Sequence, residues 1–147
     1  MKFLLILFAL AIQKPEAKHA NLKDGLAVGG YDVVSYFQGD EPEKGSKSIV
    51  TSHEGVTYRF SSENNKQKFL DNPDKYIPAY GGWCAYAMGV SGDKVKIDPE
   101  TFKIIDDKLY LFYNFWGNNT LNSWNDDESA LKTKADNYWS ETISSNK

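Results

Sequence analysis

Residues 56–76 read VTYRFSSENNKQKFLDNPDKY, and this stretch decides the predicted fold. Every second side chain over 56–60 is hydrophobic and the others are polar, which is the period of a β-strand with one buried face. Ser61-Ser62 ends the strand and offers an N-cap for a helix over 63–70. Pro73 ends that helix, because proline disfavours helical backbone at the residue before it.

The pattern extends outward in both directions from this stretch. Glu54-Gly55 lies between two runs of strand-forming residues and predicts a hairpin turn, in which glycine supplies the positive φ. The other predicted elements are a helical turn over 32–37, a strand over 48–53, a helical turn over 73–76, a buried helix starting just after Gly82, a second hairpin of residues 102–105 and 109–113, and a closing amphipathic helix over 121–138. Together they predict an α+β fold: a small antiparallel sheet of hairpins with short helices packed on it and a C-terminal amphipathic helix.

Composition places the chain among ordinary globular proteins. Its 147 residues suit one domain, and 41% of them are hydrophobic. The net charge of −3 argues against a nucleic-acid partner, since phosphate binding requires a basic surface. The single cysteine excludes an intrachain disulfide and any multi-cysteine metal site.

The N-terminus has the features of a secretory signal peptide over 1–20, which leaves 21–147 as one domain in the periplasm or outside the cell. The apolar run Phe3–Ile12 follows a lysine and is too short to cross a bilayer. Ala17 or Ala20 could be the last residue removed, whereas Ala9-Leu10-Ala11 fits the small-x-small cleavage rule but comes early. The alternative is an N-terminal core helix. We expect no integral membrane segment in the mature chain, and the oligomeric state is left open.

Cys84 is the first candidate for chemistry. In the first turn of a helix its thiolate form would be favoured, and a thiolate can be a nucleophile, a redox centre or a soft-metal ligand for copper, zinc or iron. His53 is the candidate general base for a thiol enzyme, and the second possible metal ligand. The alternative is that Cys84 is a small buried hydrophobic residue.

Several polar residues lie within aromatic runs and are candidates for the floor of a ligand pocket. Buried groups of this kind must bond to one another or to a ligand, so a self-satisfied structural network is equally open. These candidates are Asp32, Tyr36, Arg59, Tyr86 and Asn114. An aromatic pocket or an aromatic core could be formed by Trp83, Tyr86, Tyr110, Phe112, Tyr113 and Trp116.

Two blocks of the sequence carry a family resemblance. The first runs from Tyr58-Arg59-Phe60-Ser61-Ser62 through Phe69 to Asn72-Pro73-Asp74-Lys75-Tyr76, and the second is Tyr80-Gly81-Gly82-Trp83-Cys84-Ala85-Tyr86-Ala87. The first resembles a YHS domain, and the second resembles the exported, stand-alone branch of that family. In YHS domains attached to copper-transporting ATPases, two cysteines are thought to bind soft metals. The resemblance puts those cysteines at Ser61 and Asn65, so both thiolates are replaced here.

The sequence therefore favours a small exported YHS-type protein that binds a small ligand or a transition metal without catalysis. The proposed ligand residues are Cys84, Trp83, Tyr86, Asp32, Tyr36, Arg59 and Asn114, and the metal ligands would be Cys84 and His53. Two other hypotheses remain: a thiol-dependent enzyme or redox protein that uses Cys84, and a purely structural or interaction protein.

Overall fold

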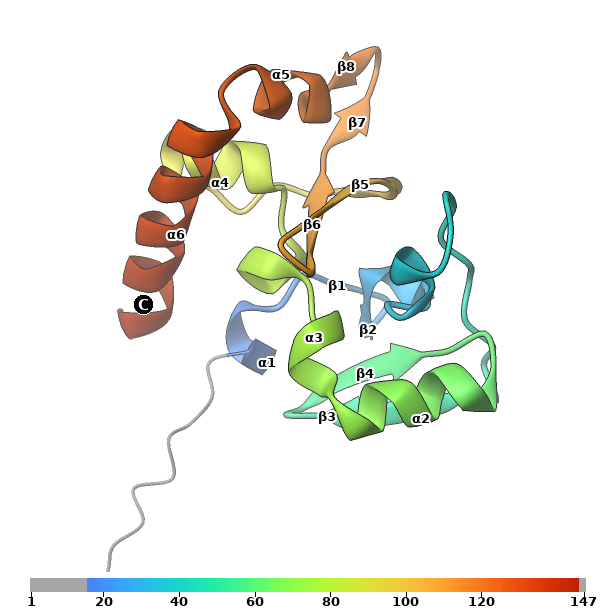
Figure 1. Ribbon diagram of the computed structural model, residues 1–147. Coiled ribbons are helices and arrows are strands. Elements are labelled where there is room, and N and C mark those ends of the chain that lie inside the picture. The colour runs from blue at the N-terminus through green and yellow to red at the C-terminus, as the bar shows by residue number, and fades with distance from the viewer. Residues whose placement is uncertain (1–15, 146–147) are drawn as a thin grey trace, which may run out of the picture.

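The structure is a computed structural model that describes residues 16–145. Its elements form two groups joined by a central hairpin (Figure 1). A four-stranded sheet with helix α2 (Glu63–Asp71) lies at one end. The other end holds helices α4 (Ala85–Ser91), α5 (Thr120–Asp126) and α6 (Glu128–Ser144). Helices and small, mostly antiparallel sheets alternate along the chain, so the α+β prediction is confirmed.

The four-stranded sheet has the order β1-β2-β4-β3. Its strands are β1 (Leu22–Lys23), β2 (Leu26–Ala27), β3 (Val50–His53) and β4 (Val56–Arg59). The predicted hairpin of β3 and β4 is present, with Glu54 at φ 51° and Gly55 at φ 81° in its turn. Positive φ at both turn residues gives the twist that adjacent antiparallel strands need. The pairing of β2 with β4 is parallel, in an otherwise antiparallel sheet.

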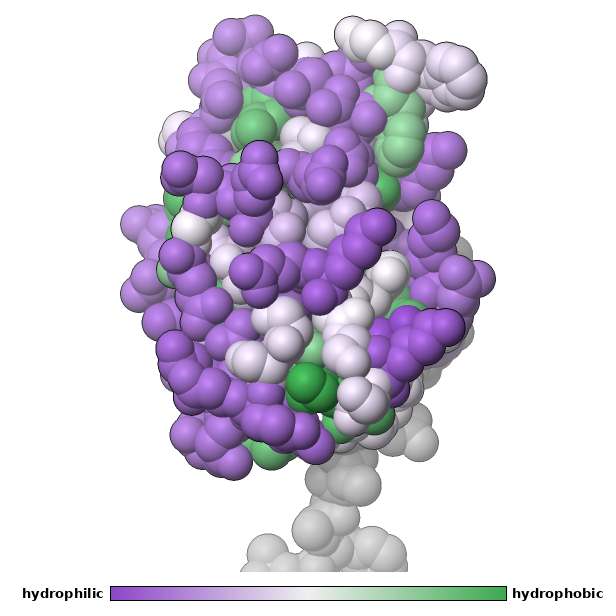
Figure 2. Space-filling view, turned by 90° about the vertical axis from the view of Figure 1, so that its right-hand side faces the viewer, coloured by the Kyte–Doolittle hydropathy of each residue, from purple (hydrophilic) through white to green (hydrophobic). Residues whose placement is uncertain are grey.

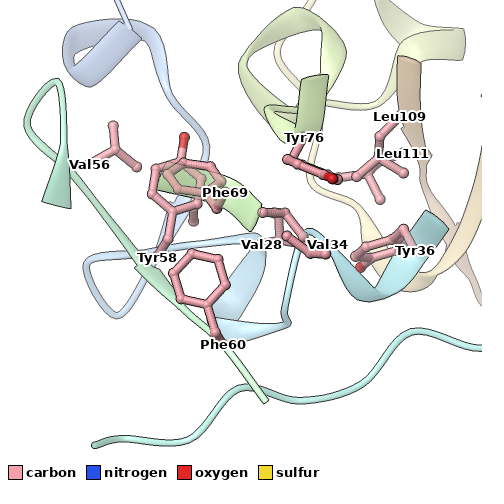
Figure 3. Close-up of a cluster of buried hydrophobic side chains, with 12 residues drawn as sticks. Val28, Val34, Tyr36, Val56, Tyr58, Phe60, Phe69, Tyr76, Leu109 and Leu111 are labelled. Carbon is pink, nitrogen blue, oxygen red and sulfur yellow. The ribbon is translucent and has the colours of Figure 1, made fainter. Parts of the chain in front are cut away.

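Helix α2 (Glu63–Asp71) covers one face of this sheet and is followed by the short helix α3 (Pro73–Tyr76). The Ser62 hydroxyl accepts a hydrogen bond from the Asn65 amide at 3.1 Å, as the predicted N-cap requires. Phe69 at the far end of α2 lies with its ring centroid 4.7 Å from that of Tyr58 and 5.3 Å from that of Phe60. Figure 3 shows these rings together in the first core.

Two short 3₁₀ segments connect the first core to the rest of the molecule. They are η1 (Val28–Gly30) and η2 (Ser35–Phe37), and η2 lies within the predicted helical turn. The fully buried Val33 and Val34 precede η2, and the Tyr36 ring meets the edge of Phe102 from the central hairpin at 4.9 Å. Figure 3 shows Val34 and Tyr36 beside Leu109 and Leu111.

The central hairpin pairs β5 (Asp98–Ile105) with β6 (Lys108–Phe112), and Asp106 and Asp107 occupy its turn. Beyond it come a two-residue hairpin of β7 (Asn114–Phe115) and β8 (Asn118–Asn119), then α5 (Thr120–Asp126) and α6 (Glu128–Ser144). The second core gathers around the fully buried Trp124, which packs against Tyr110 and Phe112.

The prediction of one closing helix over 121–138 was wrong, because the chain turns between α5 and α6. Asp127 has φ −151° and ψ 44°, outside the helical region. The turn places Glu128 where its carboxylate accepts from the Trp124 indole N–H at 3.0 Å and pairs with Lys103 at 2.6 Å. These hydrogen bonds lower the pKa of Glu128. The helical spacing of hydrophobic residues continues on both sides of Asp127, so the sequence pattern did not indicate the break.

The N-terminal residues that the structure describes lie against the molecule. Helix α1 (Glu16–His19) brings His19 to a buried position, where its backbone carbonyl accepts from the Trp83 indole N–H at 2.6 Å. The Lys94 ammonium lies 3.0 Å from Nδ1 of His19 and donates to it. Burial lowers the pKa of His19, and the neighbouring lysines lower it further. Nothing among residues 16–145 forms a helix with the length and apolar character needed to span a bilayer.

Gly89 of α4 (Ala85–Ser91) sets how closely α4 approaches α6. A Cβ at Gly89 would lie 2.7 Å from the Leu131 carbonyl oxygen, which is backbone and cannot rotate away. We therefore expect Gly89→Ala to lower the free energy of unfolding by about 1–3 kcal/mol through overpacking, although alanine has the better helix propensity. Urea denaturation measures the loss. Gly39→Ala is the control, since nothing lies within 4 Å of a Cβ at Gly39. Equal stability of the two variants would contradict this account.

Candidate functional site

Cys84 is the N-cap of α4 and not a residue of its first turn, so the predicted helix start just after Gly82 was wrong. Its backbone is not helical, with φ −56° and ψ 117°. The Cys84 N–H donates to the Val95 carbonyl at 2.9 Å, and its carbonyl accepts from Met88 at 3.0 Å. The hydrogen bond to Val95 holds Cys84 outside the helix. Val95 lies beyond the end of α4, so the residues next to Cys84 in the sequence do not reveal this contact.

Polar groups surround the Cys84 sulfur, although the residue has no exposed surface. The sulfur accepts a hydrogen bond from the Tyr113 amide at 3.3 Å and lies 3.5 Å from the Thr120 hydroxyl. That hydroxyl gives its only proton to the Tyr113 carbonyl at 2.6 Å. The thiol must therefore donate to Thr120, so the hydrogen bonds suit a neutral thiol.

A pocket of about 340 Å³ lies over this buried group. Cys84 and Thr120 contribute to its lining, and Tyr86, Val90, Val95 and Tyr113 provide apolar and aromatic surface. Asp93 and Asn118 add a carboxylate and an amide. The volume falls in the range of about 300–1,000 Å³ that is typical of small-molecule sites.

The structure brings together Cys84 and Tyr86 of the predicted ligand residues, but Trp83 faces elsewhere. The Trp83 indole donates to the carbonyl of His19, on the N-terminal segment. Among the aromatic candidates, Tyr113 also lines the pocket, Tyr110 and Phe112 are buried in the second core, and Trp116 is 96% exposed in the turn between β7 and β8.

Asp32 is fully buried, and its carboxylate joins three parts of the chain. One oxygen accepts from the backbone amides of Val34 and Ser35, at 2.9 and 3.3 Å. The other accepts from the Ser61 amide, the Ser61 hydroxyl and the Asn65 side-chain amide, each at 2.8 Å. All five donors come from the protein itself, so this is the self-satisfied network that the sequence left open.

Three other predicted ligand residues lie apart from the Cys84 pocket. The Tyr36 hydroxyl donates to the Pro99 carbonyl at 2.6 Å, and burial, more than nearby acidic groups, raises its pKa. Arg59 packs against Gly30 and Gly45, and its Nε is buried without a hydrogen-bond partner. The Asn114 side chain donates to the Thr101 hydroxyl at 3.0 Å.

His53 has surroundings different from those of Cys84. Its ring meets the edge of Phe69 at 5.8 Å, in the first core, and its Nε2 lies 3.7 Å from a Glu54 carboxylate oxygen. The Cys84 sulfur contacts Tyr113 and Thr120, at the opposite end of the molecule (Figure 1). The structure therefore provides no pairing of His53 with Cys84 for base catalysis or shared metal binding.

Comparison with known families identifies the hairpin–helix part of the chain. Residues 39–80 match the model of the YHS domain, and they include β3, β4, α2 and α3. This chain contains a YHS domain. No curated protein and no solved structure gives a significant match to the chain. The Cys84 pocket lies beyond the matched YHS residues.

The YHS family is associated with metal binding, and the residues present here do not fit a metal at the expected positions. The resemblance places the two family cysteines at Ser61 and Asn65, and both of these side chains donate to Asp32. Asn65 also exchanges hydrogen bonds with the amide of Gln38, at 2.9 and 3.2 Å. Within residues 16–145, no group of three or more His, Cys, Asp or Glu side chains could hold a metal ion.

Sequence reasoning missed Thr120, Val95, Asp93 and Asn118 as pocket residues. Thr120 lies 36 positions from Cys84 in the chain and reaches it because β7 and β8 return the chain to the start of α4. No local motif marks such a contact. The available signal was the Asn118-Asn119-Thr120 run, whose Asn119 side chain caps α5.

Asp32→Asn tests the role of the buried carboxylate. The asparagine side chain would place an NH₂ group at one of the two oxygen positions of Asp32. Because this group cannot accept hydrogen bonds, at least two of the five donors would lose their acceptor. We expect the free energy of unfolding to fall by about 2–4 kcal/mol, measured by urea denaturation. Asp40→Asn, at an exposed loop position, is the control and should be neutral. If Asp32→Asn were as stable as this control, the network would have no stabilising role.

Proposed function

We propose that this protein is a small exported module that binds a small ligand without catalysing a reaction, and that the pocket over Cys84 is its binding site. One observation carries the proposal: a pocket of about 340 Å³ lies over a buried thiol and hydroxyl that are already hydrogen-bonded to the protein. Fixed polar groups beneath apolar walls are the usual composition of a ligand site.

The lining of the pocket indicates the kind of ligand. Tyr86 and Tyr113 offer aromatic surface, and Val90 and Val95 offer aliphatic surface. The Asp93 carboxylate accepts from Ser91 at 2.8 Å and has further acceptor capacity. A small aromatic molecule that carries a hydrogen-bond donor matches these groups.

The surroundings of Cys84 support binding over thiol chemistry. A nucleophilic or redox cysteine needs a thiolate that its substrate can reach. Here the sulfur has no exposed surface, and its hydrogen bonds suit the neutral thiol. We therefore assign Cys84 to the floor of the pocket.

Indole, a neutral aromatic molecule with one N–H donor, is a suitable probe for this pocket. We expect indole to shift the backbone NMR signals of Ala87, Val95 and Asn118. Ala87→Phe should fill the pocket and weaken indole binding at least tenfold. The control, Ala130→Phe, places the same side chain on the exposed surface of α6 and should leave binding unchanged.

Three results would contradict the proposal. Indole binding that Ala87→Phe leaves unaltered would exclude this pocket as the site. Tight binding of copper(I), zinc or iron that Cys84→Ser abolishes would establish the metal hypothesis instead. Rapid alkylation of Cys84 by iodoacetamide in the folded protein would favour the thiol enzyme.

The export proposal includes a cleavage site after Ala11. Removal of residues 1–20 would eliminate the contacts of His19 with Trp83 and Lys94. Cleavage after Ala11 follows the small-x-small rule of Ala9-Leu10-Ala11 and keeps those contacts. We expect the mass of protein secreted by its native host to correspond to a chain starting at Ile12. A cytoplasmic, uncleaved product would refute export, and a chain starting at Asn21 would refute this cleavage site.

A further inference from the structure

A second cavity, of about 450 Å³, lies between the N-terminal strand and the start of the central hairpin. It is larger than the pocket over Cys84 and shares no lining residue with it. Its apolar lining comes from Leu22, Val28, Ile97, Pro99 and Phe115, which belong to segments far apart in the chain. Several backbone segments therefore fix its shape, and the cavity is not a gap beside one loop.

The charged side chains that line this cavity are both lysines, Lys23 and Lys96. Lys96 holds its ammonium 4.7 Å from the ring centroid of Phe115, and no carboxylate contacts either lysine in the described part of the chain. The chain as a whole carries a net charge of −3. Two unpaired cations in one cavity of an acidic protein create a local site of positive potential.

Asp24 follows Lys23 directly in the sequence, and Asp98 lies two positions after Lys96. Asp98 lies between the lining residues Ile97 and Pro99, and one of its oxygens accepts from the Glu100 amide at 3.0 Å. The other accepts from the Thr101 hydroxyl at 2.9 Å. These bonds hold the Asp98 carboxylate against its own strand, at the irregular part of β5, and it forms no ion pair with Lys23 or Lys96.

The N-terminal wall of the cavity is held in place. Asn21 donates from its backbone to the Gly81 carbonyl at 2.9 Å and from its side chain to the Gly82 carbonyl at 3.0 Å. The aliphatic part of Lys23 lies over Gly29, where a Cβ would meet the lysine Cδ at 3.6 Å. The stem of Lys23 is thereby supported, and within residues 16–145 its ammonium group forms no ion pair.

We propose that this cavity binds a small amphiphilic anion, in which a carboxylate or phosphate head contacts Lys23 and Lys96 and an apolar body lies against Ile97 and Phe115. Apolar surface fixes the body, and the lysines select for negative charge. The proposal is independent of the Cys84 pocket, because the two sites differ in lining and in the charge they favour.

Three naphthalene derivatives test it: 2-naphthoate, 2-naphthyl phosphate and the neutral 2-naphthamide. At low ionic strength we expect at least one of the anions to bind ten times more tightly than the amide, measured by NMR titration. The shifted signals should be those of Leu22, Gly29 and Ile97. The comparison of the two anions identifies the preferred head group.

Lys23→Gln and Lys96→Gln should each weaken anion binding at least threefold and leave binding of the amide unaltered. Lys134→Gln, on the exposed surface of α6, is the matched control. The proposal is overturned if neither anion binds, if the amide binds as tightly as the anions, or if the lysine variants match the control. Shifts confined to Ala87, Val95 and Asn118 would also overturn it, while leaving the Cys84 pocket as a binding site.

Discussion

The buried carboxylate of Asp32 is the interaction on which the YHS part of this structure depends. A carboxylate without exposed surface is stable only where hydrogen bonds replace its hydration. Here five donors do so, and they come from the turn after Asp32, the end of β4 and the first turns of α2. Each of these segments is short. The shared acceptor fixes their relative positions, and the first core of Tyr58, Phe60 and Phe69 forms beside it.

This arrangement gives Ser61 and Asn65, the positions that the family resemblance associates with metal ligands, hydrogen-bonding partners within the protein. Ser61 and Asn65 are turned toward Asp32 and have their hydrogen bonds satisfied within the protein. Hydroxyl and amide groups are poor ligands for soft metals. The two positions that the resemblance assigns to the family's cysteines have a structural role here. Both candidate ligand sites lie outside residues 39–80.

The sequence predicted those elements whose formation depends on neighbouring residues in the chain. Alternation and the turn residues Glu54-Gly55 and Asp106-Asp107 gave both main hairpins, and Ser62 with Pro73 bounded α2. The break at Asp127 was missed because the hydrophobic period runs on into α6, and only the packing of Trp124 and Glu128 reveals it. The residues of the candidate site also divide into those that neighbouring sequence brings together and those that tertiary structure brings together. Cys84 and Tyr86 share one turn and could be predicted together, whereas Thr120 joins them through tertiary structure. Asp32 was singled out as a candidate for a ligand pocket or a structural network, but its partners could not be identified from the sequence.

The two cavities have different chemical character, which follows from the segments that line them. Hydrophilic residues dominate the face shown in Figure 2, and hydrophobic ones appear there in small patches. The cavity with Lys23 depends on the N-terminal segment, which the bonds of Asn21 to Gly81 and Gly82 attach to the start of the Cys84 region. His19 strengthens this attachment through Trp83. If the chain is cleaved on export as proposed, the cleavage position matters for this cavity: a chain that began at Asn21 would place a new ammonium group at its wall and lose the contacts of His19 with Trp83 and Lys94.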